Sequence, residues 1–376
     1  RRRRNIYDKG DINMDAKKIE LTNNDYLKMV DSPSKEFIST MIDIINKRAK
    51  SISACKVLRN YETNHKYFYP SNNDVLTYNK LNTIFFQSVM PEYECIELSP
   101  ITPFALNSTL TPLSPNNSLS TIRNSEVISD SSISMALECA HRRKIGDKNL
   151  INLASSTRLL RMQKYGNGKK EHWTQHFRAC SLVTSFRNND SKMFESLYLQ
   201  ISKWLDVIYN LNLDLTKINV NIAYLPIIKM LYKELEINEQ LILKNSVNPD
   251  FNIFENFDVE MLEEVNQVDE LNELKLNKDL LLTIKNSYIY LKQNLIDKLK
   301  IKYPNVNFNF QLNRKSGINY YEYYCFETVV TFENGCDLCL VDGGITNWTG
   351  MLLSDSKEKC VSSGMGLEYL AKVYRK

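Results

Sequence analysis

Three short segments carry residue types that bind small polar ligands. The first is Arg161, which ends an apolar run and precedes a loop with two glycines and two lysines at 164–170. The second, residues 317–327, is dense in tyrosine, and the third is the Gly-x-Gly of Gly364 and Gly366. Together these segments could supply a charged fork for phosphate, an aromatic surface with hydroxyl donors, and unpaired backbone amides.

Each segment also has a purely structural interpretation. Arg161 could form a surface salt bridge at the end of a hairpin rather than hold a phosphate. Tyrosine-rich strands form sheets well without any ligand. A lone Gly-x-Gly usually reflects close packing. The residues alone leave these alternatives open.

Several other chemistries are excluded. The four histidines are too scattered for a metal cluster, and Cys336 and Cys339 have no second ligand pair at comparable spacing. The sequence contains neither a Walker-type phosphate loop nor a defensible Ser-His-Asp or Cys-His arrangement. We therefore expect no metal site.

Length and composition indicate an ordinary globular protein. The chain has 376 residues, of which 43% are hydrophobic and 24% charged, and its formal net charge is +4. A charge this small gives no argument for a nucleic-acid or membrane partner, and the four arginines at positions 1–4 are interpreted as a solvated tail. No apolar run approaches the roughly 18 residues of a spanning helix, and no leader begins the chain, so a cytoplasmic protein is expected.

The pattern of elements predicts an α+β fold with a mixed, mainly antiparallel sheet flanked by helices. Residues 1–75 are interpreted as an N-terminal extension with an amphipathic helix at 36–50. The core is expected in two parts, residues 76–218 and 305–376, separated by a helical insertion at 219–304.

Within the core, helices are expected at 79–90, 134–143 and 192–209, and a strand at 93–101 that ends at Pro100. Residues 102–120 have the composition of a loop. The apolar runs 150–163 and 176–186 predict a hairpin. Later strands are expected at 305–311, 320–332 and 337–341, then a turn at Gly343 and Gly344 and a helix from Gly364.

Taken in order, these segments resemble the catalytic core of class II aminoacyl-tRNA synthetases, in particular the histidyl-tRNA synthetase branch. The strand that ends at Pro100 resembles the first class II motif, which implies a homodimer interface there. The 160–163 segment, Leu-Arg-Met-Gln, resembles the second motif, and 364–370 the third. Residues 317–327 resemble the branch signature Gly-Leu-Asp-Tyr-Tyr, and Gly343 with Gly344 the Gly-Gly turn that follows it.

The resemblance implies a set of ligand-binding residues, with ATP and Mg as the cofactors that the family uses. The residues implied to bind ATP are Arg161, Gln163, Gly364, Gly366, Glu368 and Tyr369. Those implied to bind the second substrate are Arg123, Ser125, Glu126, Gln175, Tyr320, Tyr321, Gly343 and Gly344. If the chain is active, Arg161 and Arg123 are the implied catalytic groups.

The sequence departs from the family pattern at four positions. The two lost arginines argue against an efficient synthetase, and Leu182 argues against histidine as the ligand. Tyr369 replaces the third-motif arginine, and Ser316 falls where the family has the arginine before its branch signature. Gln163 replaces the second-motif glutamate, and Leu182 falls about where the family keeps a glutamate for the histidine imidazole. Loss of one preorganised donor typically costs about 10²–10³ in rate.

Our leading hypothesis is therefore a paralogue that binds a small ligand or nucleotide as a regulatory or accessory subunit, in the manner of the regulatory subunit of short-form ATP phosphoribosyltransferase. The alternative is a diverged ATP-dependent adenylate-forming enzyme that activates another amino acid or acid. Because the chain stops just after the third motif, no anticodon-binding domain is expected and tRNA is not an expected partner. A protein partner is compatible with the leading hypothesis, and a nucleic-acid-binding role for the Lys169-Lys170 loop has the least support.

Overall fold

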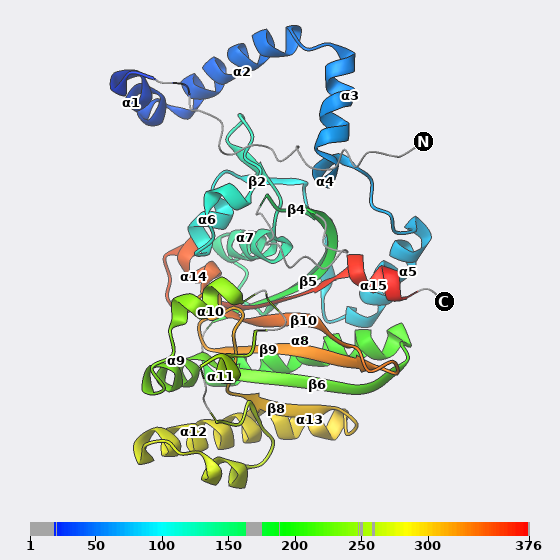
Figure 1. The fold of residues 1–376 in the computed structure, drawn as a ribbon, viewed down its shortest axis with the longest axis vertical. Helices are drawn as coiled ribbons and strands as arrows, with labels where there is room; N and C mark the ends of the chain where they lie inside the picture. The colour runs from blue at the N-terminus through cyan, green and yellow to red at the C-terminus, as the bar shows by residue number, and fades with distance from the viewer. Residues whose placement is uncertain are drawn as a thin grey trace, which may run out of the picture.

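The computed structural model describes residues 19, 21–162, 175–187, 189–246, 248, 251–257 and 260–374. For His65 and Tyr369 only the backbone is described. Within these residues the fold is α+β, as predicted: a large, mostly antiparallel sheet with helices on both faces (Figure 1).

The main sheet has nine strands among the described residues, in the order β1-β4-β5-β11-β10-β9-β6-β8-β7. Only β1 with β4 and β6 with β8 pair in parallel, and the other pairs are antiparallel. A second, two-stranded sheet joins β2 and β3. The strands are β1 Glu94–Cys95, β2 Ile101–Pro103, β3 Ser125–Val127, β4 Ile151–Leu160, β5 His176–Arg187, β6 Leu215–Tyr224, β7 Glu264–Val265, β8 Asn307–Gln311, β9 Tyr324–Phe332, β10 Asp337–Thr346 and β11 Glu358–Gly366.

Helices cover the two faces of the sheet and bury its apolar residues. The helices α5 (Val75–Val89) and α8 (Asp190–Leu211) pack on one face, against Cys180 and Leu182 of β5. The helices α7 (Ser131–Lys144) and α14 (Trp348–Leu353) pack on the opposite face, where Val183 lies. The amphipathic period of α8 follows from apolar residues at helical spacing, and Asn189 caps its first turn.

The hairpin of β4 and β5 is confirmed, with Ile151 opposite Ser185 and Leu160 opposite His176. Side chains alternate between the two faces along each strand. On β5, Phe177, Ala179 and Ser181 therefore lie on the face of α7, and Arg178 and Cys180 on the face of α5. This alternation decides which residues can share a site.

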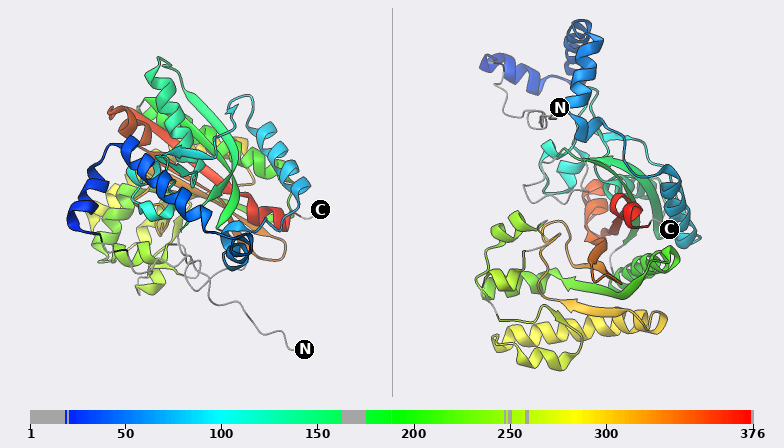
Figure 2. Two further views of the ribbon diagram at one scale, coloured as in Figure 1. Left: turned by 90° about the horizontal axis from the view of Figure 1, so that it is seen from above. Right: turned by 45° about the vertical axis from the view of Figure 1, so that its right-hand side comes forward.

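The N-terminal helices extend away from the sheet (Figure 2). They are α1 (Asn23–Asp31), α2 (Ser34–Lys50) and α3 (Ala54–Thr63). The short helix α4 (His65–Phe68) follows α3 and lies near Arg158 of β4 and Arg178 of β5. The first three contain no buried residue. The helix predicted at 36–50 is confirmed as α2.

The segment predicted as a helical insertion does not begin at residue 219. Residues 215–224 form β6, a central strand between β9 and β8, and the helices begin only at α9. The apolar content of β6 reflects burial within the sheet rather than a helical face. The segment then contains α9 (Leu225–Glu234), α10 (Glu239–Asn245), α11 (Ile253–Asn256), the 3₁₀ turn η2 (Val268–Glu273), α12 (Lys278–Leu291), the π-helical turn η3 (Lys292–Ile296) and α13 (Asp297–Lys302).

Two predictions between residues 93 and 120 were wrong. The strand expected at 93–101 is divided into β1 and β2, because the chain leaves the main sheet after β1 and pairs with β3 instead. The expected loop contains α6 (Leu106–Leu110) and the 3₁₀ turn η1 (Pro115–Asn117). A distant carboxylate caps α6: Glu126 accepts hydrogen bonds from the backbone N–H groups of Ala105 and Asn107, at 3.2 and 3.1 Å.

The C-terminal part differs in three details. Gly343 and Gly344 lie inside β10 rather than in a turn. Both positions require glycine because a side chain would overlap Ser363 of β11 or Cys325 of β9. The strand predicted from residue 320 begins at Tyr324, so Tyr320 and Tyr321 belong to the preceding turn, which starts at Gly317 with φ +72°. The last helix, α15 (Leu367–Val373), starts after Gly366, so both glycines of the Gly-x-Gly belong to β11.

Candidate functional site

Arg161 lies directly after β4, where the hairpin leaves the sheet. Its backbone N–H donates to the carbonyl of Gln175 at 2.8 Å, which continues the ladder by one residue. Its Nε donates to the carbonyl of Ser129 at 3.1 Å, and its Nη2 lies 3.7 Å from Asp130 Oδ2. The guanidinium also stacks over the ring of Phe177, 5.1 Å from the ring centroid. Three contacts within the chain thus orient Arg161, although 36% of its side chain remains exposed.

Asp130 connects this arginine to the tyrosines of the C-terminal part. Its Oδ1 caps α7 by accepting the N–H of Ser132 at 2.9 Å, and its Oδ2 accepts the hydroxyl of Tyr320 at 2.9 Å. The ring of Tyr320 packs edge-on against Trp348, with ring centroids 5.1 Å apart. A residue from the turn before β9 is therefore fixed against the start of α7.

A second charged cluster lies beside the first, around Arg314. The Arg314 side chain is 0% exposed and its Nη1 donates to Glu327 Oε2 at 2.9 Å. Its Nη2 pairs with Asp342, and its Nε donates to the carbonyl of Ser316 at 2.8 Å. Each of the three nitrogens of this guanidinium thus donates to a group of the protein itself.

Tyr321 closes this cluster over the glycines of β10. Its hydroxyl donates to Asp342 Oδ1 at 2.7 Å, and its ring lies edge-on to Tyr320 at 5.1 Å. A Cβ added at Gly344 would lie 2.7 Å from the ring of Tyr321, and one at Gly343 would lie 2.8 Å from the ring of Phe326. The two glycines are therefore required by the close approach of aromatic rings to the sheet.

Burial and nearby carboxylates perturb the titration of these groups. Burial and the charge of Asp130 raise the pKa of Tyr320 well above its ordinary value, and burial and Asp342 do the same for Tyr321. Burial alone would lower the pKa of Arg314, but the charges of Asp342 and Glu327 raise it well above its ordinary value. Both tyrosines are hydrogen-bond donors and Arg314 is a permanent cation near neutral pH.

The structure brings some of the sequence-predicted residues together. Arg161, Tyr320, Tyr321, Gly343 and Gly344 all belong to the two clusters. Gly364 lies opposite Ser181, on the strand adjacent to β10, and Ser181 shares a hydrogen bond of 2.6 Å with Ser131. The side chain of Gln175 is buried beside Arg161.

Other predicted residues lie elsewhere. Glu126 caps α6, Ser125 hydrogen-bonds to Thr121 at 2.7 Å, and Arg123 is exposed. Gly366 ends β11 with open space around it. Gln163 and the side chain of Tyr369 lie outside the described residues.

Glu368 points to the opposite face of the hairpin from the clusters. It accepts hydrogen bonds from Ser71 Oγ and from the backbone N–H of Arg178, the latter at 3.2 Å. The same alternation corrects the position expected to face an imidazole. Leu182 packs into the core beneath α5 and α8, and Val183, which is also apolar, faces α7.

The sequence interpretation missed Asp130, Asp342, Trp348 and the role of Arg314. The sequence interpretation placed the family arginine at Ser316, two residues after Arg314, and so gave Arg314 no role. Asp130 could have been found from its Asp-Ser-Ser context before a helical pattern, which is typical of an N-cap. No local signal marks Asp342, whose role depends on a contact with Arg314 from the segment between β8 and β9.

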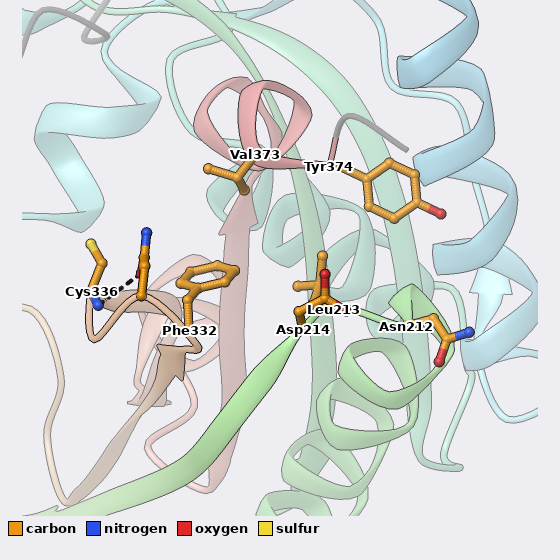
Figure 3. Close-up of a pocket in the computed structure, with 8 residues that line it drawn as sticks. Asn212, Leu213, Asp214, Phe332, Cys336, Val373 and Tyr374 are labelled. Atoms are coloured by element: carbon orange, nitrogen blue, oxygen red, sulfur yellow. Dashed lines mark hydrogen bonds between the residues drawn. The ribbon is translucent and has the colours of Figure 1, made fainter.

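The described residues show three further features. They contain no group of three or more His, Cys, Asp or Glu side chains arranged to hold a metal ion. None of their helices combines the length and apolar character needed to cross a membrane. A small pocket of about 290 Å³ lies between the start of β6, the end of β9 and Tyr374, away from the clusters (Figure 3).

Comparisons with known proteins place this arrangement in a known fold. No family model and no curated protein matches the chain. Among solved structures it is similar to an ATP phosphoribosyltransferase regulatory subunit/histidyl-tRNA synthetase from Bacillus halodurans, with 12% identity, a TM-score of 0.56, and coverage of 82% of this chain and 83% of that one.

Two further structures agree. The histidyl-tRNA synthetase from Nostoc sp. PCC 7120 has 14% identity and a TM-score of 0.57, over 81% of this chain and 73% of its own. The histidine-tRNA ligase subunit from Alicyclobacillus acidocaldarius has 10% identity and a TM-score of 0.57, over 81% of this chain and 94% of its own. The chain therefore has the class II aminoacyl-tRNA synthetase fold, in the form found in histidyl-tRNA synthetases and related regulatory subunits.

Proposed function

We propose that this protein is a histidyl-tRNA synthetase-like paralogue that binds a small ligand in the site around Tyr320 and acts as a regulatory or accessory subunit rather than charging tRNA. The main support for the proposal is that its two buried or half-buried arginines already pair with groups of the chain. Arg314 is enclosed between Glu327 and Asp342, and Arg161 is held by Asp130 and the Ser129 carbonyl.

Amino-acid activation needs positive charge directed at a triphosphate while its negative charge redistributes. In this site the arginines are already neutralised by carboxylates of the chain. Three carboxylates (Asp130, Glu327 and Asp342) face two guanidinium groups. The resulting excess of negative charge disfavours the binding of a polyanion unless Mg accompanies it.

The same balance favours a ligand with a cationic or hydrogen-bond-donating group. Asp342 is 37% exposed on its side chain, and the aromatic rings of Tyr320, Tyr321 and Trp348 surround the cluster. A carboxylate beside aromatic rings is the usual environment for the ammonium group of an amino acid or amine. We therefore include amino acids first among the candidate ligands.

The regulatory role and the homodimer belong to the same proposal. One similar structure is described as a regulatory subunit, which supports a role through a protein partner. Pro100 is exposed in the connection between β1 and β2, at the edge of the main sheet. We propose this edge as the contact between two copies of the chain.

Calorimetric titration with the twenty amino acids and with nucleotides tests the ligand-binding part. At least one should bind, and Tyr320→Phe should weaken it, because a hydroxyl bonded to a carboxylate is lost from the site. Because the hydroxyl donates to Asp130 and not to the ligand, the effect on affinity is indirect, and we expect a loss of about twofold to tenfold, equivalent to about 0.5–1.5 kcal/mol. Tyr323→Phe, which alters an exposed ring near Lys359, is the matched control and should bind as the wild type does. If no amino acid or nucleotide binds, the proposal fails.

One observation supports the alternative, an adenylate-forming enzyme. The Arg161 side chain retains partial exposure and its ion pair with Asp130 is long, at 3.7 Å. A ligand phosphate could therefore compete for this guanidinium. The alternative requires ATP to bind, so a calorimetric titration with ATP and Mg that shows no binding would eliminate it.

A further inference from the structure

A cleft lies on the face of the hairpin that points away from the candidate functional site. It has a volume of about 580 Å³ and is open to solvent. Its floor is formed by Arg158 and Arg178, and its walls by the segment 67–73 and the first turns of α5. The volume falls within the range of small-molecule pockets.

The floor of this cleft carries an excess of positive charge. Arg158 and Arg178 are directly opposite each other in the β4 and β5 ladder, so their side chains lie on the same face. Like charges in this position are destabilising unless something compensates for them. His176, at the next cross-strand position on this face, shares a hydrogen bond of 2.9 Å with Arg158 Nη1.

One carboxylate, Glu368, compensates only in part. It lies 3.9 Å from Arg158 Nη2 and accepts the backbone N–H of Arg178, not its guanidinium. Among the described residues no carboxylate pairs with the Arg178 side chain, whose Nη1 donates to the Ser156 carbonyl at 3.1 Å. The floor of the cleft thus holds two guanidinium groups, and Glu368 lies near the guanidinium of Arg158 only.

The walls are aromatic. Tyr67, Phe68, Tyr69 and Tyr78 line the cleft, and Phe68 is 52% exposed although it is a large apolar side chain. The guanidinium of Arg158 already lies over the ring of Tyr78, 5.6 Å from its centroid. Aromatic walls above a cationic floor match a ligand that joins a planar ring to an anion.

From these observations we propose that the cleft binds a nucleotide unit, with the phosphate on Arg178 and Arg158 and the base against the aromatic wall. The unit could be a free mononucleotide or the 5′-phosphorylated end of an RNA strand, since both present the same chemistry. The proposal is independent of the function proposed above, because the two sites use opposite faces of the same hairpin.

Calorimetry with the full chain tests the proposal, using AMP, adenosine and a 5′-phosphorylated single-stranded oligonucleotide as probes. AMP should bind at least about tenfold more tightly than adenosine, because charge-assisted hydrogen bonds to phosphate are the stronger kind. A tighter and strongly salt-dependent oligonucleotide complex identifies the RNA end as the source. Equal affinity for AMP and the oligonucleotide identifies the free nucleotide.

Variants locate the binding. Arg178→Gln should weaken AMP by about tenfold or more, and Arg178→Lys, which keeps the charge, should weaken it less. Arg187→Gln is the matched control, because Arg187 ends the same strand but pairs with Asp355 and Glu358 outside the cleft. Thermal unfolding of each variant verifies that it is folded.

Two results would overturn the proposal. The first is that neither AMP nor the oligonucleotide binds the wild-type protein. The second is that AMP binding survives Arg178→Gln but is lost in Tyr320→Phe, which would place the nucleotide in the candidate functional site instead.

Discussion

Replacement of Arg314 by methionine is the perturbation for which the structure gives the clearest magnitude. The substitution keeps the length and much of the volume of the side chain but removes its charge. It leaves Glu327 and Asp342 facing each other without the cation that pairs with both. Removal of one partner from a buried ion pair costs about 3–5 kcal/mol.

The exposure of the carboxylates sets the expected value within that range. Arg314 is 0% exposed, but Glu327 and Asp342 are 18% and 37% exposed and can regain some hydration. We therefore expect a loss near the lower limit, about 3 kcal/mol in the free energy of unfolding. In domains of 150–250 residues 1 kcal/mol corresponds to about 2–4 °C in Tm, and the longer chain here favours the lower slope, so Tm should fall by about 6 °C.

The assay is thermal unfolding followed by circular dichroism, with Arg142→Met as the matched control. Arg142 also contacts two carboxylates, Glu94 and Glu138, but all three side chains are partly exposed. Its loss should cost about 0–1 kcal/mol, or less than about 2 °C. Adding Asp342→Asn to Arg314→Met should recover part of the loss, because it removes one unpaired charge. Equal melting of Arg314→Met and the wild type, or an equal loss in Arg142→Met, would refute the reasoning.

Three further predictions follow from the same contacts. Gly344→Ala should destabilise the protein by about 1–3 kcal/mol in chemical denaturation, because the new methyl group overlaps the ring of Tyr321, whereas Gly366→Ala has open space and should be neutral. The pKa values of Tyr320 and Tyr321 are raised in the folded state. The stability that these two tyrosines contribute is therefore fully present below about pH 10 and is lost as the pH rises through their folded-state pKa values. A tyrosinate absorbance titration in which every tyrosine of the folded protein ionises near pH 10 would contradict this prediction. Tyr369→Arg alone should not restore amino-acid activation in a pyrophosphate exchange assay, because Arg314 stays enclosed by carboxylates and Ser316 supplies no charge; exchange in this variant would show that one arginine suffices.

Local patterns predicted most of the fold but not its long-range caps and crossings. The apolar spacing of α8 and the alternation of the β4 and β5 hairpin are properties of adjacent residues, so both were predictable. The helix α6 was not, because Glu126 stabilises its first turn from about twenty residues away. The strand β6 was taken as helical because the helical pattern of the segment that follows it was extended back to residue 219, although Ile218, Val220 and Ile222 alternate with Asn219 and Asn221 as in a strand.

The candidate site, like the fold, was predictable only where its residues have a local sequence signal. Arg161, Tyr320 and Tyr321 were predicted from motif order, and the structure brings them together. Their partners Asp130 and Asp342 were not predicted, because an isolated aspartate has no sequence signature and acquires its role only through the fold. The charge of the site depends on these partners, so its chemistry could not be derived from the sequence.

The carboxylates Asp130, Glu327 and Asp342 pair with the arginines of this site, and we propose that these arginines therefore do not support amino-acid activation. The most direct test is ATP–pyrophosphate exchange by the wild-type protein with Mg and each of the twenty amino acids, with an active histidyl-tRNA synthetase as the positive control. We expect no exchange above the enzyme-free background with any amino acid, including those found to bind by calorimetry. Exchange that depends on any one amino acid, and that is abolished by Arg161→Gln, would contradict the account and establish the adenylating alternative.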